Sequence, residues 1–234
     1  MPSPCRNPRG TKLAAVSVRT PTPAEALERE WWSRLPRLLY APGPVFAELR
    51  DESREAADAR QEPLVAVLFV AGIAMFLSLV ALEPPYEYYR ELSGLTLTVE
   101  SILGGMLVGI SNFWLGGALV YLGARGLGAT SGYRLARHIA GFATAPFILA
   151  LFFLWPARLA VYGADLFRSG RADHGTAVEV FRAIDALLLV WTLALVLIGI
   201  RETQRWPWSK TAAAVGIAAL FAVLFGTLAY AASR

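Results

Sequence analysis

Apolar residues along the chain gather into five runs that are almost free of charge and are separated by polar segments. The runs predict spans at about residues 63–83, 101–124, 138–157, 183–201 and 211–233. An α-helix needs roughly 20 apolar residues to cross a hydrocarbon core about 30 Å thick. The pattern therefore predicts an all-α integral membrane protein, with a bundle of five transmembrane helices over residues 63–234.

The fourth run is the shortest of the five. Its uncharged part extends only from Ala186 to Ile200. It reaches spanning length when Asp185 or Arg182 is placed near an interface, where a charged side chain is tolerated.

A segment with mixed character, residues 31–62, precedes the first run. Pro44 suits the first turn of a helix, and Val45, Phe46 and Leu49 fall on one side of that helix at three- and four-residue spacing. The charges in this segment exclude it from the bilayer core. We therefore expect an N-terminal amphipathic segment that leads into the first span.

Aromatic and basic residues alternate at the start of this lead-in. Trp31, Trp32, Arg34 and Arg37 have the mixture that is typical of a segment lying in the membrane interface. We expect these four residues to act as an interfacial anchor on the cytoplasmic side. In the alternative interpretation, the apolar residues of the lead-in pack under the helical bundle as a plug.

Glycines follow a regular spacing in the second run. Gly105 and Gly109 are four residues apart, and Gly109, Gly116 and Gly123 follow at seven-residue steps. Small residues at such spacing let a neighbouring backbone approach closely in a membrane. We expect these four glycines to form a helix-packing groove on one face.

Composition supports a membrane location. Hydrophobic residues make up 56% of the 234 residues and charged residues 17%, which excludes an ordinary soluble domain. The first 24 residues carry Arg6, Arg9, Lys12 and Arg19 but no acid, so we expect residues 1–30 to be a disordered basic tail. The net charge of +4 is small, and we expect the lipid bilayer, and no nucleic acid, as a partner.

Basic residues also predict the orientation. If the N-terminus is cytoplasmic, 16 Lys and Arg residues lie inside, including Arg125, Arg134 and Arg137, and 6 lie outside. We therefore expect a multi-pass protein of the cell (plasma) membrane. Its N-terminus is cytoplasmic, and its C-terminus, after five spans, is outside.

Few side chains could support chemistry. The single Cys5 and two histidines cannot form the usual zinc sites, and no catalytic motif occurs, so we expect no metal, no cofactor and no catalytic residue. Asn112, near the middle of the second span, could line a polar pathway or form a hydrogen bond between helices. Asp185 could pair with Arg182 or Arg158, or remain a hydrated carboxylate at the interface.

A basic group precedes the third run. His138 lies beside Arg134 and Arg137 at the expected inner mouth of the span. These side chains could bind an anionic headgroup or a phosphate, and they equally fit the positive flank that orients a span.

Three stretches resemble the Yip (Ypt-interacting protein one) family, and more specifically its prokaryotic relatives, over roughly Arg34 to Tyr230. They are the lead-in RLLYAPGPVFAEL, the third run AGFATAPFIL and the end of the fourth run, VWTLALVLIGIRETQ. Gly141, Phe142 and Pro146 sit like the glycine, aromatic and proline of the family's third span. The resemblance implies five spans with the N-terminus inside and the C-terminus outside.

The resemblance also implies a partner for eukaryotic members, which associate with small prenylated GTPases. Those members carry an acidic-Leu-Tyr-Gly-Pro motif, whereas this chain reads LLYAPGP, with no acid and with Ala41 after Tyr40. We do not carry GTPase binding over. The expected function is non-enzymatic, a scaffold that organises the membrane, partner proteins or further copies of the chain. The alternative is a permease or transporter component that moves a small solute.

Overall fold

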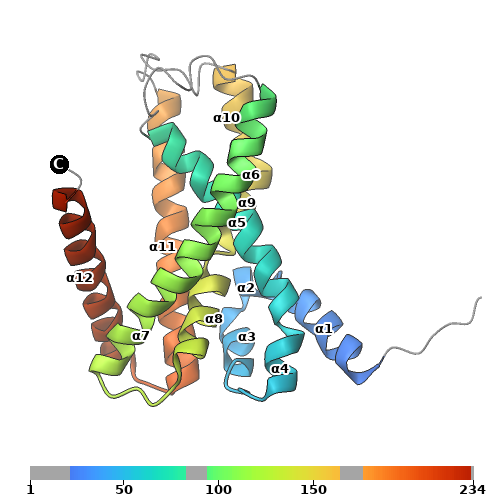
Figure 1. Cartoon of the computed structure of the whole chain (residues 1–234), viewed down its shortest axis with the longest axis vertical. Coiled ribbons are helices and arrows are strands. Elements are labelled where there is room, and N and C mark those ends of the chain that lie inside the picture. Colours follow the sequence, from blue (N-terminus) through green and yellow to red (C-terminus); the bar gives the residue numbers. More distant parts are fainter. Residues whose placement is uncertain (1–21, 83–93, 164–175, 233–234) are drawn as a thin grey trace, which may run out of the picture.

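The computed structural model describes residues 22–82, 94–163 and 176–232. All regular structure in these residues is helical. Five helical stretches are long and apolar enough to cross a membrane: Arg54–Val80, Gly94–Gly126, Tyr133–Tyr162, Ala177–Gln204 and Trp208–Leu228. The predicted all-α fold with five membrane-spanning helices is confirmed, and Figure 1 shows the bundle.

Three of the five stretches are interrupted helices. The first consists of α4 (Arg54–Ala59) and α5 (Gln61–Leu82), the fourth is α11 (Thr176–Gln204) and the fifth is α12 (Trp208–Ala232). The second contains α6 (Gly94–Ser111), the π-helix η2 (Asn112–Gly116) and α7 (Gly117–Gly126). The third contains α8 (Tyr133–Ala143), α9 (Pro146–Leu149), the π-helix η3 (Ala150–Leu154) and α10 (Trp155–Tyr162).

The third stretch lies at the centre of the bundle. In its most apolar window 67% of the residues are buried, against 17% to 39% for the other four stretches. It is interrupted at Thr144 and Ala145, just before Pro146, because proline lacks the N–H that a continuous helix requires. Helix α10 continues to Tyr162, whereas the rest of the segment whose path was open, to Phe167, lies outside the described residues.

Three short helices precede the first stretch: α1 (Pro23–Arg34), α2 (Arg37–Tyr40) and α3 (Pro42–Glu48). Thr22 caps α1 through a reciprocal pair of hydrogen bonds with Glu25. Figure 1 shows these helices at the end of the bundle that also holds the α7–α8 and α11–α12 connections. We call this end the inner end.

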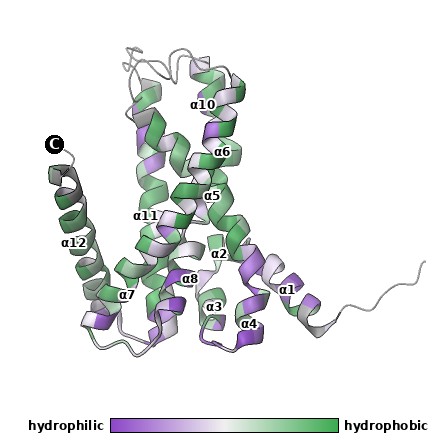
Figure 2. Ribbon diagram, viewed as in Figure 1, coloured by the Kyte–Doolittle hydropathy of each residue, from purple (hydrophilic) through white to green (hydrophobic). Residues whose placement is uncertain are grey.

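Hydropathy follows this arrangement. Figure 2 shows hydrophobic residues along α5, α6 and α11, and hydrophilic residues concentrated on α1, α4 and the start of α8. The side chains that face away from the bundle are largely apolar, and Leu107, Phe153 and Leu220 are each more than 60% exposed. A hydrocarbon environment makes such exposure favourable, so the outer surface suits a bilayer.

Candidate functional site

The inner end is a packed layer and not a loose tail. Leu38, Phe46 and Leu49 are completely buried, and they belong to one apolar cluster with residues of α5, α8 and α11. The Trp31 ring stacks on the Phe142 ring of the third span, with 5.6 Å between centroids and 12° between planes. The short helices α2 and α3 therefore close the base of the bundle.

Polar contacts tie the same layer to the connections at the inner end. Arg50 Nε donates a hydrogen bond of 2.8 Å to the Glu202 carbonyl, and the two side chains form an ion pair at 3.6 Å. Arg134 donates a hydrogen bond to the Glu52 carbonyl. These contacts join the α3–α4 connection to α11 and α8, which lie far away in the sequence.

The expected interfacial anchor is divided between two environments. Trp31 is only 3% exposed and lies in the core, so for this residue the plug interpretation describes the structure. Trp32 is 42% exposed and Arg37 is exposed, whereas the Arg34 guanidinium lies 5.1 Å from the Trp31 ring. Successive residues of a helix point about 100° apart, which allows adjacent tryptophans to take opposite roles.

A fully buried arginine, Arg60, lies at the junction of α4 and α5. Its Nη1 donates a 3.0 Å hydrogen bond to the Asp51 carbonyl, whereas Nε and Nη2 have no hydrogen-bond partner in the described part of the chain. The Ser53 N–H donates to the Asp51 carboxylate at 2.9 Å and lowers the pKa of Asp51. Asp51 therefore stays charged beside Arg60. The sequence analysis missed Arg60.

A second basic group lies on one face of α8. The Arg137 guanidinium sits 4.1 Å from the Trp114 ring centroid and 5.0 Å from those of Phe113 and Tyr133. Such cation–π contacts hold a positive charge in a partly apolar place. His138 is 7% exposed, and its Nδ1 has no hydrogen-bond partner among the described residues.

These basic side chains influence one another. The positive charges of Arg60, Arg134 and Arg137 all act on the His138 imidazole. Arg137 and His138 lie three and four residues after Arg134, so a helix brings both close to Arg134 on one side. The predicted basic group at the mouth of the third span is thus one cluster, to which the structure adds Arg60.

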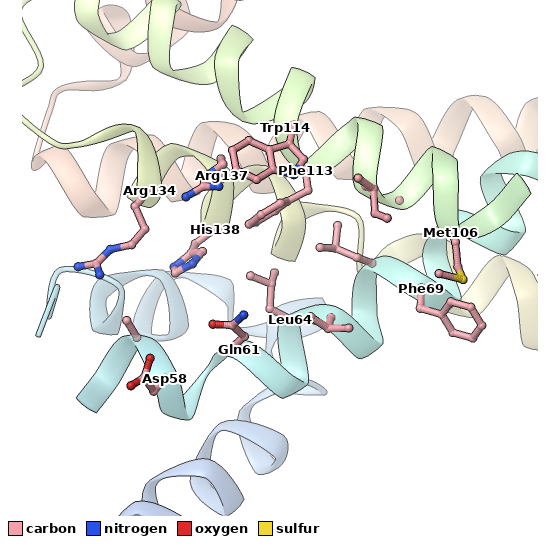
Figure 3. Close-up of a pocket in the computed structure, with 15 residues that line it drawn as sticks. Asp58, Gln61, Leu64, Phe69, Met106, Phe113, Trp114, Arg134, Arg137 and His138 are labelled. Atoms are coloured by element: carbon pink, nitrogen blue, oxygen red, sulfur yellow. The ribbon is translucent and has the colours of Figure 1, made fainter. Parts of the chain in front are cut away.

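A cavity of about 430 Å³ opens beside this cluster, between α4, α5, α6, η2 and α8. Figure 3 shows Arg134, Arg137 and His138 at one end, with Asp58 and Gln61 opposite, and Phe69 and Met106 at the other end. The volume lies in the range of about 300–1,000 Å³ that is usual for small-molecule sites. The cavity is therefore polar at its inner end and apolar toward the middle of the bundle.

The expected packing glycines contact two different neighbours. A Cβ on Gly105 would lie 2.7 Å from Ile73 Cα, and one on Gly109 would lie 2.4 Å from the Leu68 carbonyl oxygen, so both face α5. A Cβ on Gly123 would lie 2.2 Å from the Ala214 carbonyl oxygen, so Gly123 faces α12. The intervening η2 has a wider turn, which changes the helical phase and divides the expected single groove.

Two further predicted residues lie in η2. Asn112 opens this π-helix and is half-buried, and a Cβ on Gly116 would lie 3.0 Å from its Oδ1. The sequence analysis missed Gly72, the counterpart on α5, where a Cβ would lie 2.2 Å from the Gly105 carbonyl oxygen. Gly72 lies in the aliphatic run of a different span, so its sequence separation from the other glycines does not show that they meet.

The family-motif residues lie where α8 meets its neighbours. Gly141, Phe142 and Pro146 are all buried. A Cβ on Gly141 would lie 2.6 Å from Leu64 Cδ1, so α8 and α5 approach closely there. These residues surround the base of the bundle, and Phe142 links it to Trp31.

An ion pair lies toward the opposite end of the bundle. Arg158 donates to Asp185, and the two side chains are 7% and 24% exposed. Asp185 thus takes Arg158 as its partner, one of the two that the sequence allowed, and Arg182 pairs with Glu179 at 3.3 Å. Within the described residues, no three His, Cys, Asp or Glu side chains group as a metal site.

A family model described as the Yip1 domain matches residues 37–230. Comparison with the curated proteins and with the solved structures gives no match. The matched region covers well over half of the chain and includes α2, α3, the basic cluster and all five spans. The chain therefore belongs to the Yip family of multi-span membrane proteins.

Proposed function

We propose that this protein is a non-enzymatic member of the prokaryotic branch of the family, and that it organises partner proteins or lipids at one side of the plasma membrane. The main supporting observation is the inner layer, in which Leu38 and Phe46 are completely buried. A surface that is already ordered binds a partner without the cost of fixing its conformation.

The inner layer also exposes side chains that suit a protein interface. Tyr40 is 74% exposed, Trp32 is 42% exposed, and Arg37 is exposed between them in sequence. Tyrosine, tryptophan and arginine dominate binding energy at protein interfaces. We call Trp32, Arg37 and Tyr40 the inner face, and we propose that it contacts a membrane-associated protein or another copy of the chain.

The proposed orientation places the inner end in the cytoplasm and the C-terminus outside. Arg125, Arg134, Arg137 and Arg201 support this proposal, because they lie on helices that reach the inner end. Basic residues favour the cytoplasmic side of bacterial and eukaryotic membranes. Small-GTPase binding is not part of the proposal, since the motif around Tyr40 lacks the acid of the eukaryotic members.

The test is capture of the tagged full chain from its native membrane, with bound proteins identified by mass spectrometry. The variant carries Trp32→Ala and Tyr40→Ala, and the matched control carries Phe225→Ala, an aromatic residue of α12 that is 55% exposed. We expect a partner that is retained by the wild type and the control and lost from the variant. Equal recovery from all three proteins contradicts the proposal.

Point substitutions are needed because deletion of the lead-in is not a clean test. Removal of residues 1–62 takes away Trp31 and Phe46 and exposes the buried Phe142. Loss of a partner from that deletion would then report damage to the bundle.

A permease component is the second candidate. It is supported by two π-helical turns, η2 with Asn112 and η3, since such turns are frequent at functional sites inside helices. It predicts that proteoliposomes take up a small solute and that Asn112→Leu reduces the flux. No flux above protein-free liposomes across a broad solute panel contradicts it.

A further inference from the structure

The open cavity beside the basic cluster has two chemically different ends. Its inner end is formed by Arg134, Arg137 and His138 from α8, together with Gln61 from the start of α5. These side chains offer several N–H groups to an oxygen-rich ligand. Arg137 Nε and His138 Nδ1 are both buried and have no hydrogen-bond partner among the described residues.

The charge of this end is positive. Arg134 and Arg137 line the cavity, and Arg60 lies behind it with a charge that acts on both Arg134 and His138. Asp58 is the acid on the lining, and its exposed carboxylate lies 3.8 Å from Arg54. The positive charges of Arg60, Arg134 and Arg137 repel one another, so an anion at this end lowers the electrostatic energy of the cluster.

The other end of the cavity is apolar and open to the surroundings of the bundle. Its walls are the exposed side chains Val65 (55%), Phe69 (37%), Met106 (44%) and Ile110 (51%), from α5 and α6. These residues belong to two membrane-spanning stretches. A ligand that enters from this side therefore comes from the bilayer and meets the basic end with its polar part.

We propose that the cavity binds an anionic phospholipid from the leaflet at the inner end. The phosphate lies against Arg134, Arg137 and His138, and an acyl chain runs along the exposed apolar surface of the α5–α6 pair toward Phe69 and Met106 (Figure 3). The site holds the headgroup and the first part of a chain, and the rest of the lipid remains in the bilayer. This proposal does not depend on the scaffold function, because a partner-free protein would bind the lipid equally well.

The chemistry at the basic end fits the phosphate of a lipid and a free phosphate alike. The apolar end distinguishes them, because only a lipid has an acyl chain that contacts it. We choose palmitoyl-oleoyl phosphatidylglycerol as the probe, with palmitoyl-oleoyl phosphatidylcholine and inorganic phosphate as comparisons. Binding to the purified full chain in detergent micelles is measured by native mass spectrometry and by the shift of the thermal unfolding midpoint. We expect phosphatidylglycerol to bind at least about fivefold more tightly than phosphatidylcholine, and inorganic phosphate to produce no shift.

Two nearly isosteric substitutions change the charge of the cavity in opposite directions. Gln61→Glu adds a negative charge at the basic end, and Asp58→Asn removes one. Both side chains are exposed, so neither substitution disturbs the core. One charge near a headgroup changes affinity by about fivefold. We expect Gln61→Glu to weaken phosphatidylglycerol binding and Asp58→Asn to strengthen it, each by about this factor, with lipid-free unfolding unchanged.

Three results would overturn the proposal. The first is equal binding of the two lipids. The second is wild-type affinity for phosphatidylglycerol in both the Gln61→Glu and the Asp58→Asn protein. The third is stabilisation by inorganic phosphate that matches the lipid, which would assign the site to a soluble anion.

Discussion

Substitution of Gly109 by alanine tests the close packing of the first two spans. A Cβ at this position would lie 2.4 Å from the Leu68 carbonyl oxygen and 3.1 Å from its carbon. Ordinary contact begins at 3.4 Å, so α5 and α6 must separate by about 1 Å. Backbone atoms cannot rotate away from such a contact as a flexible side chain can.

The magnitude follows from two opposing effects. Overpacking costs about 1–3 kcal/mol, and the upper end applies because Gly72 and Gly105 share the interface and lose contact when the helices separate. Alanine gains up to about 1 kcal/mol over glycine in helix propensity. We therefore expect Gly109→Ala to lower the free energy of unfolding by about 2 kcal/mol.

The chain provides matched controls at other helical glycines. A Cβ on Gly216 of α12 meets nothing within 4 Å, so Gly216→Ala keeps the propensity gain without a clash. Gly116→Ala is intermediate, because its Cβ meets the terminal oxygen of Asn112, a side chain that can rotate. The expected order of stability is Gly216→Ala, then Gly116→Ala, then Gly109→Ala.

The assay is equilibrium unfolding of the three variants and the wild type in mixed micelles with increasing dodecyl sulfate, followed by tryptophan fluorescence. If Gly109→Ala is as stable as Gly216→Ala, α5 and α6 do not pack through these glycines, and the reasoning fails.

Two further predictions use the same unfolding assay. Phe142→Ala removes a completely buried ring that stacks on Trp31 and should cost about 3–5 kcal/mol, whereas Phe153→Ala, at a ring 71% exposed, should change stability by less than about 0.5 kcal/mol. Similar values for the two would contradict the buried position of Phe142. Asp185→Ala leaves Arg158 without its carboxylate partner and should cost about 2 kcal/mol of unfolding free energy. This is less than the roughly 3–5 kcal/mol of a fully buried pair, because Asp185 is 24% exposed. Glu179→Ala, in an exposed pair, should cost at most about 1 kcal/mol. A larger loss for Glu179→Ala would refute the assignment of the Arg158 pair.

The five spans could be predicted because each apolar run is a direct consequence of the bilayer, which accepts only long uncharged helices. The position of the lead-in was harder to predict. Phe46 and Leu49 fall on one side of the helix whether that helix lies in a membrane interface or packs at the base of a bundle. Their spacing therefore does not distinguish the two locations. Only tertiary contacts, such as the stacking of the Trp31 ring on the Phe142 ring, distinguish packing at the base of the bundle from a position in the interface.

The candidate site was predictable only in part. Arg134, Arg137 and His138 lie on one side of a helix, which their spacing reveals. Arg60 has the sequence context of an ordinary charged residue before a span, and its burial depends on tertiary contacts such as the hydrogen bond to the Asp51 carbonyl. The divided glycine groove has a similar origin, because the π-helix at Asn112 changes the helical phase without a sequence signal as plain as a proline.

Disulfide trapping in native membranes tests most directly whether the lead-in is a fixed inner layer. A Cβ on Gly43 of α3 would lie 4.0 Å from Glu202 Cγ of α11, so Gly43→Cys and Glu202→Cys should cross-link under mild oxidation once Cys5 is replaced by serine. The control pair is Gly43→Cys with Gly216→Cys, where the second position has no neighbour within 4 Å. We predict rapid cross-linking of the first pair and none of the second. Equal cross-linking of the two pairs, or none in the first, would show that the lead-in lies free of the bundle.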